Sequence, residues 1–179
     1  MMFGYNVTEL ISQSRIQERL REIAEAISDR YHDRIPILIG VLNGSFIFMA
    51  DLMRHLTIDC EMDFIKVSSY LKTESTGTVR LLKDISADIT GRDVIIVEDI
   101  IDSGLTISFL KDRLEGASPR SLAFATLLMK PDITNIDFPI DYVGFEIPPD
   151  YVVGYGLDYE QKLRHLPGIY RLEGKKIDD

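Results

Sequence analysis

Two adjacent carboxylates, Glu98 and Asp99, follow an unbroken β-branched run from Val94 to Val97. Such a run is typical of a strand buried on both faces, as in a parallel sheet. Asp102-Ser103-Gly104-Leu105-Thr106 comes next and leads into a predicted helix through about Leu114. A Ser/Gly/Thr loop at a helix start offers amides, hydroxyls and a positive dipole end to a phosphate. Acids beside that loop would repel a phosphate unless they bound a sugar diol, a metal ion or a proton. We therefore expect a phosphorylated sugar at the carboxyl end of a parallel sheet.

The same loop has a simpler interpretation as the cap of the following helix. Asp102 or Ser103 would cap that helix and Gly104 would ease the turn, which is the commoner use of an isolated Asp-Ser-Gly. The acid pair shifts the balance, because burying two adjacent charges is costly unless they have partners. The sequence contains neither G-x-x-x-x-G-K-[ST] nor G-x-G-x-x-G. A standard nucleotide-triphosphate or dinucleotide pocket is therefore not expected.

Composition limits the class of protein. The chain has 179 residues, 45% apolar and 27% charged, which is ordinary for one soluble globular domain. A formal net charge of -9 argues against a nucleic-acid partner, since phosphate contacts require concentrated Lys and Arg. The single cysteine, Cys60, excludes an internal disulfide framework. No apolar run approaches the roughly 20 residues that span a bilayer, and no signal peptide is visible. We expect a cytoplasmic protein without a membrane partner.

Strand and helix patterns alternate from residue 36 to residue 129. Apolar residues recur at helical spacing from Ile16 to Ile27, and Ser14 with Gln17 forms a plausible capping box. The other predicted elements are strands over 36–42, 62–68, 94–97 and 121–129, a helix over 46–54, an exposed polar loop over 70–78, and short aromatic strands over 142–145 and 151–155. This alternation predicts an α/β fold with a doubly wound, mainly parallel sheet flanked by helices. We expect a single domain over 1–179, with its core at about 35–130 and a smaller lobe mainly over 131–179.

Five ordered motifs carry a family resemblance over about residues 35–167. VIIVEDIIDSGLT resembles the phosphoribosyl pyrophosphate motif of type I phosphoribosyltransferases. GVLNGSFIF, SSYLKTESTG, LLMKPD and DYVGFEIPPDYVVGYGLDYEQKLRHLP are similar to segments of the hypoxanthine (guanine) phosphoribosyltransferases. The resemblance implies that the smaller lobe, with N-terminal residues, forms a hood over the active site.

The resemblance implies roles for the acid pair and the loop after it. Glu98 and Asp99 would hold the ribose hydroxyls, which suits carboxylates that accept hydrogen bonds from a vicinal diol. The loop Asp102, Ser103, Gly104, Leu105 and Thr106 would surround the 5-phosphate. Asp102 would also accept and donate a proton at the purine N7 and stabilise positive charge on the ribose as pyrophosphate leaves.

The pyrophosphate side involves two further segments. Leu42, Asn43 and Gly44 match the family's pyrophosphate loop, in which a cis peptide commonly precedes the second residue, and Arg164 would pair with pyrophosphate oxygens. Asn43 departs from many relatives, which have Lys or Arg there; a plain glycine turn is the alternative. Ser69 and Tyr70, with the loop to Gly77, match a lid that excludes water, although an ordinary surface hairpin fits the composition equally.

The purine and metal sites complete the implied active site. Lys130 would donate to the 6-oxo group, Tyr151 would stack on the base, and the main chain of Val152 would contact the ring near position 2. A solvated strand end and simple core packing are the respective alternatives for Lys130 and Tyr151. Asp158 would bind a Mg²⁺ that bridges to pyrophosphate, with Glu98 and Asp99 as further metal-side carboxylates.

The predicted reaction joins hypoxanthine, and also guanine, to 5-phosphoribosyl 1-pyrophosphate, giving IMP or GMP and pyrophosphate in purine salvage. The family relation also implies a homodimer or homotetramer. One alternative is an enzyme that prefers guanine and xanthine. The other is a regulator that senses phosphoribosyl pyrophosphate and binds RNA, against which the acidic composition counts.

Overall fold

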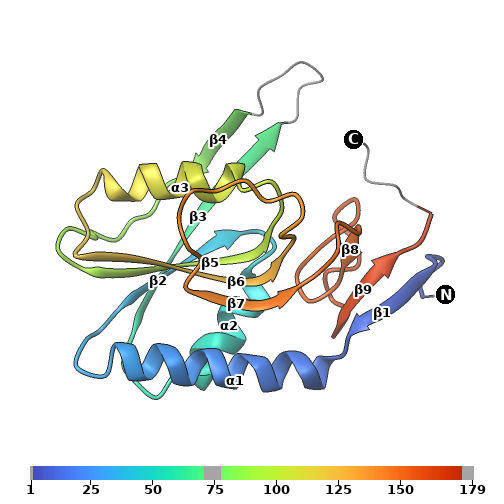
Figure 1. Ribbon diagram of the computed structural model, residues 1–179, viewed down its shortest axis with the longest axis horizontal. Coiled ribbons are helices and arrows are strands. Elements are labelled where there is room, and N and C mark those ends of the chain that lie inside the picture. Colours follow the sequence, from blue (N-terminus) through green and yellow to red (C-terminus); the bar gives the residue numbers. More distant parts are fainter. Residues whose placement is uncertain (1, 71–77, 175–179) are drawn as a thin grey trace.

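A six-stranded sheet forms the centre of the computed structural model, which describes residues 2–70 and 78–174 (Figure 1). The strands run in the order β4-β3-β2-β5-β6-β7. Five of them pair in parallel, and β4 pairs antiparallel with β3 at one edge. Their bounds are β2 Ile37–Leu42, β3 Glu61–Tyr70, β4 Thr78–Lys83, β5 Asp93–Ile101, β6 Ser121–Met129 and β7 Tyr142–Glu146. The mainly parallel α/β sheet predicted from the sequence is therefore confirmed.

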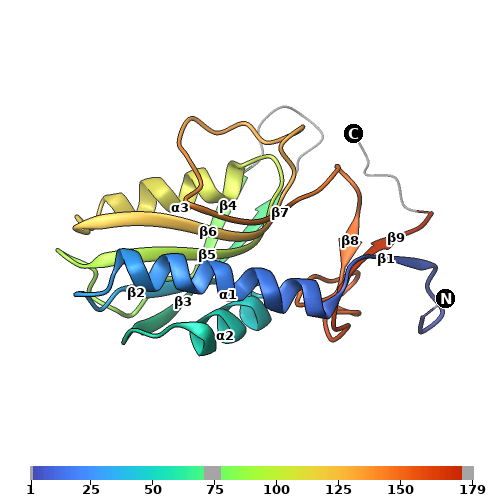
Figure 2. The same ribbon diagram turned by 60° about the horizontal axis from the view of Figure 1, so that its bottom comes forward.

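Helices cover both faces of this sheet (Figure 2). Helices α1 (Gln13–Arg30) and α2 (Phe46–His55) lie on one face, and α3 (Leu105–Glu115) lies on the other. Alternate residues of β5 enter the two cores: Ile95 packs with residues of α1 and α2, and Ile96 packs with residues of α3. The unbroken β-branched run of β5 thus reflects burial on both faces.

A second sheet of three antiparallel strands, β1-β9-β8, lies beyond one end of the main sheet (Figure 1). It contains β1 (Val7–Ile11), β8 (Val152–Val153) and β9 (Ile169–Leu172). We call these strands, with the loop over 154–168, the hood. Strand β1 pairs with β9, so segments from opposite ends of the sequence build it together.

Four local predictions differ from the structure. The segment 142–145 was assigned to the smaller lobe, but β7 pairs in parallel with β6 and belongs to the main sheet. Strand β5 continues past Val97 to Ile101, because its pairing with β6 extends to Met129. The N-cap of α1 is Ser12, whose Oγ accepts from the Arg15 backbone N–H at 3.4 Å, and Gln17 donates to Asp51 instead, so the predicted capping box of Ser14 with Gln17 is wrong. Strands β1, β4 and β9 were not predicted.

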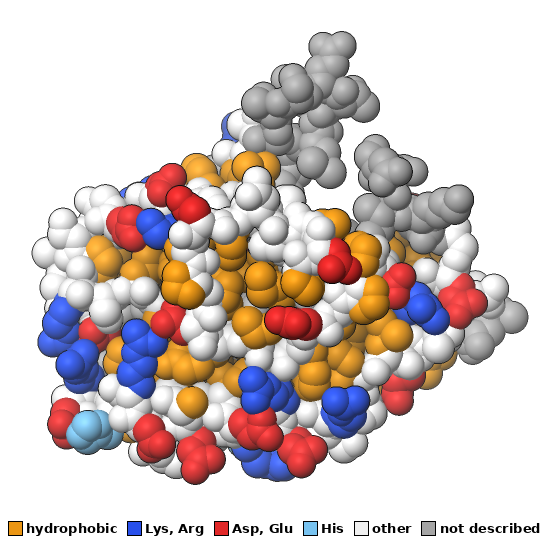
Figure 3. Space-filling view, viewed as in Figure 1, with side chains coloured by type: hydrophobic (Ala, Val, Ile, Leu, Met, Phe, Trp, Pro, Cys, Tyr) orange, Lys and Arg blue, Asp and Glu red, His pale blue; other side chains and the backbone are white. Residues whose placement is uncertain are grey.

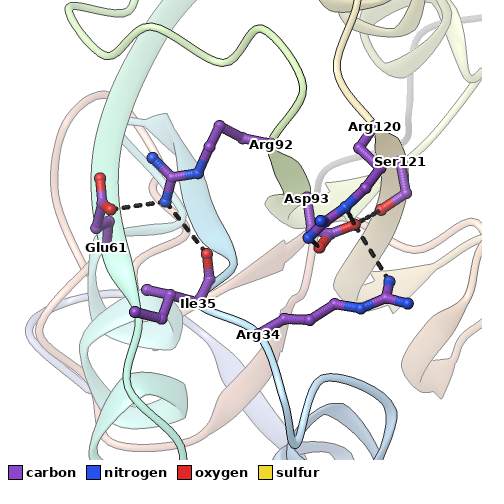
Figure 4. A network of polar contacts seen from close by, with 7 residues as sticks. All are labelled: Arg34, Ile35, Glu61, Arg92, Asp93, Arg120 and Ser121. Carbon is purple, nitrogen blue, oxygen red and sulfur yellow. Dashed lines mark hydrogen bonds and ion pairs between the residues drawn. The ribbon is translucent and has the colours of Figure 1, made fainter.

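A polar network ties together the amino ends of the strands (Figure 4). Asp93 at the start of β5 has a fully buried side chain that is paired with Arg120 and lies 3.5 Å from Arg34. The Ser121 hydroxyl donates to Asp93 at 2.5 Å. The hydrogen bond from Arg120 outweighs burial and lowers the pKa of Asp93. This buried charge is fully partnered, so we assign the network a structural role.

The surface shows no large field of one sign on the face in Figure 3, where acidic and basic side chains lie together along the edge formed by α1. No helix within the described part of the chain has the length and apolar character needed to cross a membrane.

Candidate active site

A cavity of about 560 Å³ lies at the carboxyl ends of β2, β3 and β5 and is bounded by the hood. Most of the predicted site residues line it: Leu42, Asn43, Gly44, Ser69, Glu98, Asp99, Asp102, Ser103, Gly104, Leu105, Thr106, Asp158 and Arg164. They come from segments up to about 120 positions apart: the parallel sheet brings those from β2, β3 and β5 and the loops after them to one edge, and the hood loop contributes Asp158 and Arg164. The side chain of Tyr70 and residues 71–77 of the predicted lid lie outside the described residues.

The acid pair lies within β5, whereas the prediction placed it just after the end of that strand. Glu98 is 5% exposed and accepts from the Asp99 amide at 3.2 Å, while Asp99 accepts from the Ile100 amide at 3.0 Å. Burial raises the pKa of both carboxyls, and the neighbouring Asp99 charge raises that of Glu98 further. Ligand hydroxyls or a cation would relieve this cost, because either stabilises the ionised form.

The phosphate-type loop ends at the start of α3. Gly104 occupies the N-cap position with φ +90°, and no side chain caps the helix. A Cβ there would overlap the side chain of Ile136, so the position requires glycine. Ser103, one residue before this position, accepts a 3.4 Å hydrogen bond at its Oγ from the Leu105 backbone N–H. Residues at the start of α3 therefore face the cavity with amides available to an anion.

The pyrophosphate-type loop packs against both the acid pair and the hood. The peptide bond between Leu42 and Asn43 is cis, as the family resemblance implied. A Cβ at Gly44 would overlap the carboxylate of Asp99, and a Cβ at Gly156 would overlap the carbonyl oxygen of Gly44. Backbone from the hood thus contacts backbone of this loop directly.

Arg164 is held at the edge of the cavity by three groups of its own loop. Its guanidinium lies 3.1 Å from Asp158 Oδ1, donates to the Gly156 carbonyl at 2.8 Å, and donates to Gln161 Oε1 at 2.9 Å. The backbone N–H of Gln161 donates to Asp158 Oδ2 at 2.7 Å. These contacts fix Asp158 and Arg164 relative to each other before any ligand enters.

The hood loop is anchored to α2 through Tyr155. Its hydroxyl is buried against the carboxylate of Asp51, to which Gln17 also donates at 2.8 Å. Burial and this carboxylate raise the pKa of Tyr155 far above its ordinary range, so the hydroxyl stays a hydrogen-bond donor. Because α2 begins just after the pyrophosphate-type loop, the anchor fixes the two loops relative to each other.

The three residues predicted to contact a purine do not line this cavity. Lys130 is 5% exposed and its Nζ lies 2.6 Å from Asp102 Oδ1. The alternative of a solvated strand end is therefore wrong for Lys130. Tyr151 donates from its hydroxyl to the Asp158 carbonyl at 3.2 Å, and Val152 is buried in β8. Lys130 and Tyr151 each contact a residue that lines the cavity.

Sequence reasoning missed three polar cavity residues, Lys66, Ser68 and Gln161. Lys66 and Ser68 alternate along the predicted strand 62–68 and precede Ser69, so their position at a strand's carboxyl end could have indicated them.

Within residues 2–70 and 78–174, no three His, Cys, Asp or Glu side chains group as a metal site.

Comparisons with known proteins show the family to which the chain belongs. The model of the phosphoribosyl transferase domain family matches residues 6–160, and the chain belongs to this family. The Bacillus subtilis hypoxanthine-guanine phosphoribosyltransferase is 46% identical over 161 residues, or 89% of each chain. The Salmonella typhimurium hypoxanthine phosphoribosyltransferase is 47% identical over 168 residues, covering 92% of this chain and 94% of the relative.

Solved structures give the same result. The hypoxanthine-guanine phosphoribosyltransferase of Bacillus anthracis, with HEPES in its active site, superposes with a TM-score of 0.89 at 48% identity, covering 94% of this chain and 99% of that one. The Trypanosoma cruzi hypoxanthine phosphoribosyltransferase in complex with the product IMP has a TM-score of 0.88 at 38% identity, covering 97% of both chains. The family resemblance seen in the motifs is confirmed.

Proposed function

We propose that this chain is a purine-salvage enzyme that joins hypoxanthine, and also guanine, to 5-phosphoribosyl 1-pyrophosphate. The products are IMP or GMP and pyrophosphate. The observation that carries the proposal is the convergence of the acid pair, the α3 amide loop and the Arg164 loop around one cavity. Each offers what one part of the donor requires: acceptors for the ribose hydroxyls, amides for the 5-phosphate and a guanidinium for pyrophosphate.

The contact between Lys130 and Asp102 supports their proposed roles on the base. On a 6-oxopurine, the 6-oxo group and N7 lie next to each other on one edge of the ring. Lys130 Nζ and Asp102 Oδ1 lie 2.6 Å apart. When a purine binds, Lys130 can donate to the 6-oxo group and Asp102 can interact with N7 in place of this ion pair. Asp102 then holds or releases the N7 proton and stabilises the positive ribose as the pyrophosphate bond breaks. Tyr151 would stack on the base and Val152 would contact its edge.

The donor set also fits Mg²⁺. Glu98, Asp99 and Asp158 present hard oxygen ligands to the cavity, and the burial that raises the pKa of the first two makes a cation a favourable partner for them. When bound, the ion would neutralise charge on the departing pyrophosphate.

The proposal is tested by measuring initial rates with hypoxanthine, guanine, xanthine and adenine, each with the donor and with or without Mg²⁺. We expect Mg²⁺-dependent nucleotide formation with hypoxanthine and guanine. We expect little with adenine, because its 6-amino group is a hydrogen-bond donor and cannot accept from Lys130. Faster turnover of guanine and xanthine would favour the alternative enzyme. RNA binding without turnover would favour the regulator. Sedimentation of the same preparation tests the proposed homodimer or homotetramer.

A further inference from the structure

Lys66 projects into the cavity beside the pyrophosphate-type loop. It lies on β3 directly opposite Leu42 in the parallel β2–β3 register, and it lines the cavity with Asn43 and Gly44. Phe64, two residues earlier and on the same face of the strand, packs in the core cluster of α2. The side chain of Lys66 is therefore on the side of the sheet that α2 covers.

The charge around the cavity makes each basic group important. Among the described residues that line it, four are acidic (Glu98, Asp99, Asp102 and Asp158), and two, Lys66 and Arg164, are basic. The donor of the proposed reaction carries a phosphate and a pyrophosphate, so it brings several more negative charges. Asn43, at the turn of the pyrophosphate-type loop, is neutral and supplies only an amide dipole.

The two basic side chains differ in the number of ion pairs and hydrogen bonds that they make with the described residues. Arg164 is bonded to Asp158, Gly156 and Gln161. Lys66 makes no ion pair or side-chain hydrogen bond with the rest of the described chain. Ser68, on the same face of β3, also lines the cavity, and its buried Oγ has no hydrogen-bond partner within the described residues. Two polar side chains without a hydrogen-bond partner among the described residues, those of Lys66 and Ser68, thus lie two positions apart on the strand that lines the cavity.

We propose that Lys66, together with Ser68, binds the pyrophosphate group of the sugar donor and supplies the positive charge that Asn43 lacks. This inference rests on the proposed function. An oxygen of the pyrophosphate accepts from the Lys66 ammonium and the Ser68 hydroxyl, while Arg164 binds from the hood loop. The arrangement gives Lys66 a role specific to the donor, because the purine residues Lys130 and Asp102 lie at another part of the site.

The test compares Lys66→Met, Lys66→Arg and the control Lys111→Met. Lys111 pairs with Glu115 on the surface of α3, so its loss changes the net charge equally away from the cavity. Calorimetry would measure the Kd of inorganic pyrophosphate with Mg²⁺, and initial rates would give KM for the donor and for hypoxanthine. Loss of a charged hydrogen bond should raise the pyrophosphate Kd and the donor KM of Lys66→Met roughly 10- to 100-fold.

The remaining expected results separate this role from a structural one. The KM for hypoxanthine should stay within about twofold in Lys66→Met, since the purine contacts are intact. Lys66→Arg should restore most of the pyrophosphate affinity, and Lys111→Met should match the unmodified protein. An unchanged pyrophosphate Kd in Lys66→Met, when the unmodified protein binds pyrophosphate, would overturn the Lys66 assignment alone. Failure of the unmodified protein to bind pyrophosphate and to form nucleotide would overturn the proposed function as well.

Discussion

Gly156→Ala probes the direct backbone contact between the hood and the pyrophosphate-type loop. The added Cβ would overlap the Gly44 carbonyl oxygen and lie 3.2 Å from its carbon, and Gly156 has φ +102°. Neither partner is a flexible side chain, so the two backbones must separate by about 1 Å to restore ordinary contact. Arg164 donates to the Gly156 carbonyl and would move with it.

Two costs follow from this geometry, and they are measured separately. Placing alanine at positive φ costs about 1–3 kcal/mol of unfolding free energy. Displacing a substrate-positioning group by about 1 Å costs on the order of 10²-fold in rate. We therefore expect kcat/KM for the donor to fall on the order of 10²-fold, measured from initial rates over a range of donor concentrations. Chemical denaturation gives the stability change.

Gly91→Ala is the matched control. Gly91 has φ +67°, and a Cβ there would meet nothing within 4 Å. It should carry a similar stability cost without any change in kinetics. If Gly156→Ala and Gly91→Ala lost stability alike and both kept the donor kcat/KM of the unmodified protein, the claim that this contact positions Arg164 would be refuted.

Three further predictions concern single side chains. Asp102→Asn should lower turnover by roughly 10²- to 10⁴-fold, the range for loss of a general acid–base group, and single-turnover rates unaffected by the change would exclude that role. Lys130→Ala should raise the KM for hypoxanthine roughly tenfold through loss of a charged hydrogen bond, with the donor KM as internal reference; an unaltered hypoxanthine KM would remove Lys130 from the base site. Asp93→Asn should lower the unfolding free energy at pH 7 by about 1.5–3 kcal/mol. Because the folded pKa of Asp93 is lowered, its contribution is present above the unfolded pKa of about 3.9 and is lost as pH falls through the folded pKa. Denaturation curves should therefore converge in acid for the two proteins, and a constant gap down to pH 2 would contradict the linkage.

The sequence predicted the segments whose local pattern matches their environment. The run from Val94 to Val97 is buried on both faces, and Gly104 occupies a position that only glycine fits. Such features are visible in a short window because burial and backbone conformation act on each residue directly. The central strands, α3 and the loop from Asp102 to Thr106 were predicted for this reason, whereas Asn43, Asp158 and Arg164 were implied only by the family resemblance.

Features that depend on pairing between distant segments were not accessible in the same way. The extension of β5 to Ile101 is set by its register with β6, and the placement of β7 is set by which edge it joins. The ion pair of Lys130 with Asp102 and the contact of Gly156 with Gly44 arise only when strands and hood are assembled. A short strand such as β1, with five residues, is too short to show a clear alternation of apolar and polar residues.

The pairing of β1 with β9 joins segments that leave the ribosome far apart in time. Thr8 Oγ1 donates to Glu173 Oε1 at 2.5 Å across 165 positions, so this sheet closes a loop that contains nearly all of the described chain. Contacts between such distant positions form late, because loop-closure entropy must be offset first. A nascent chain that has emerged as far as β7 has every strand of the central sheet, yet lacks Asp158 and Arg164. Ribosome-bound intermediates should consequently be folded but inactive.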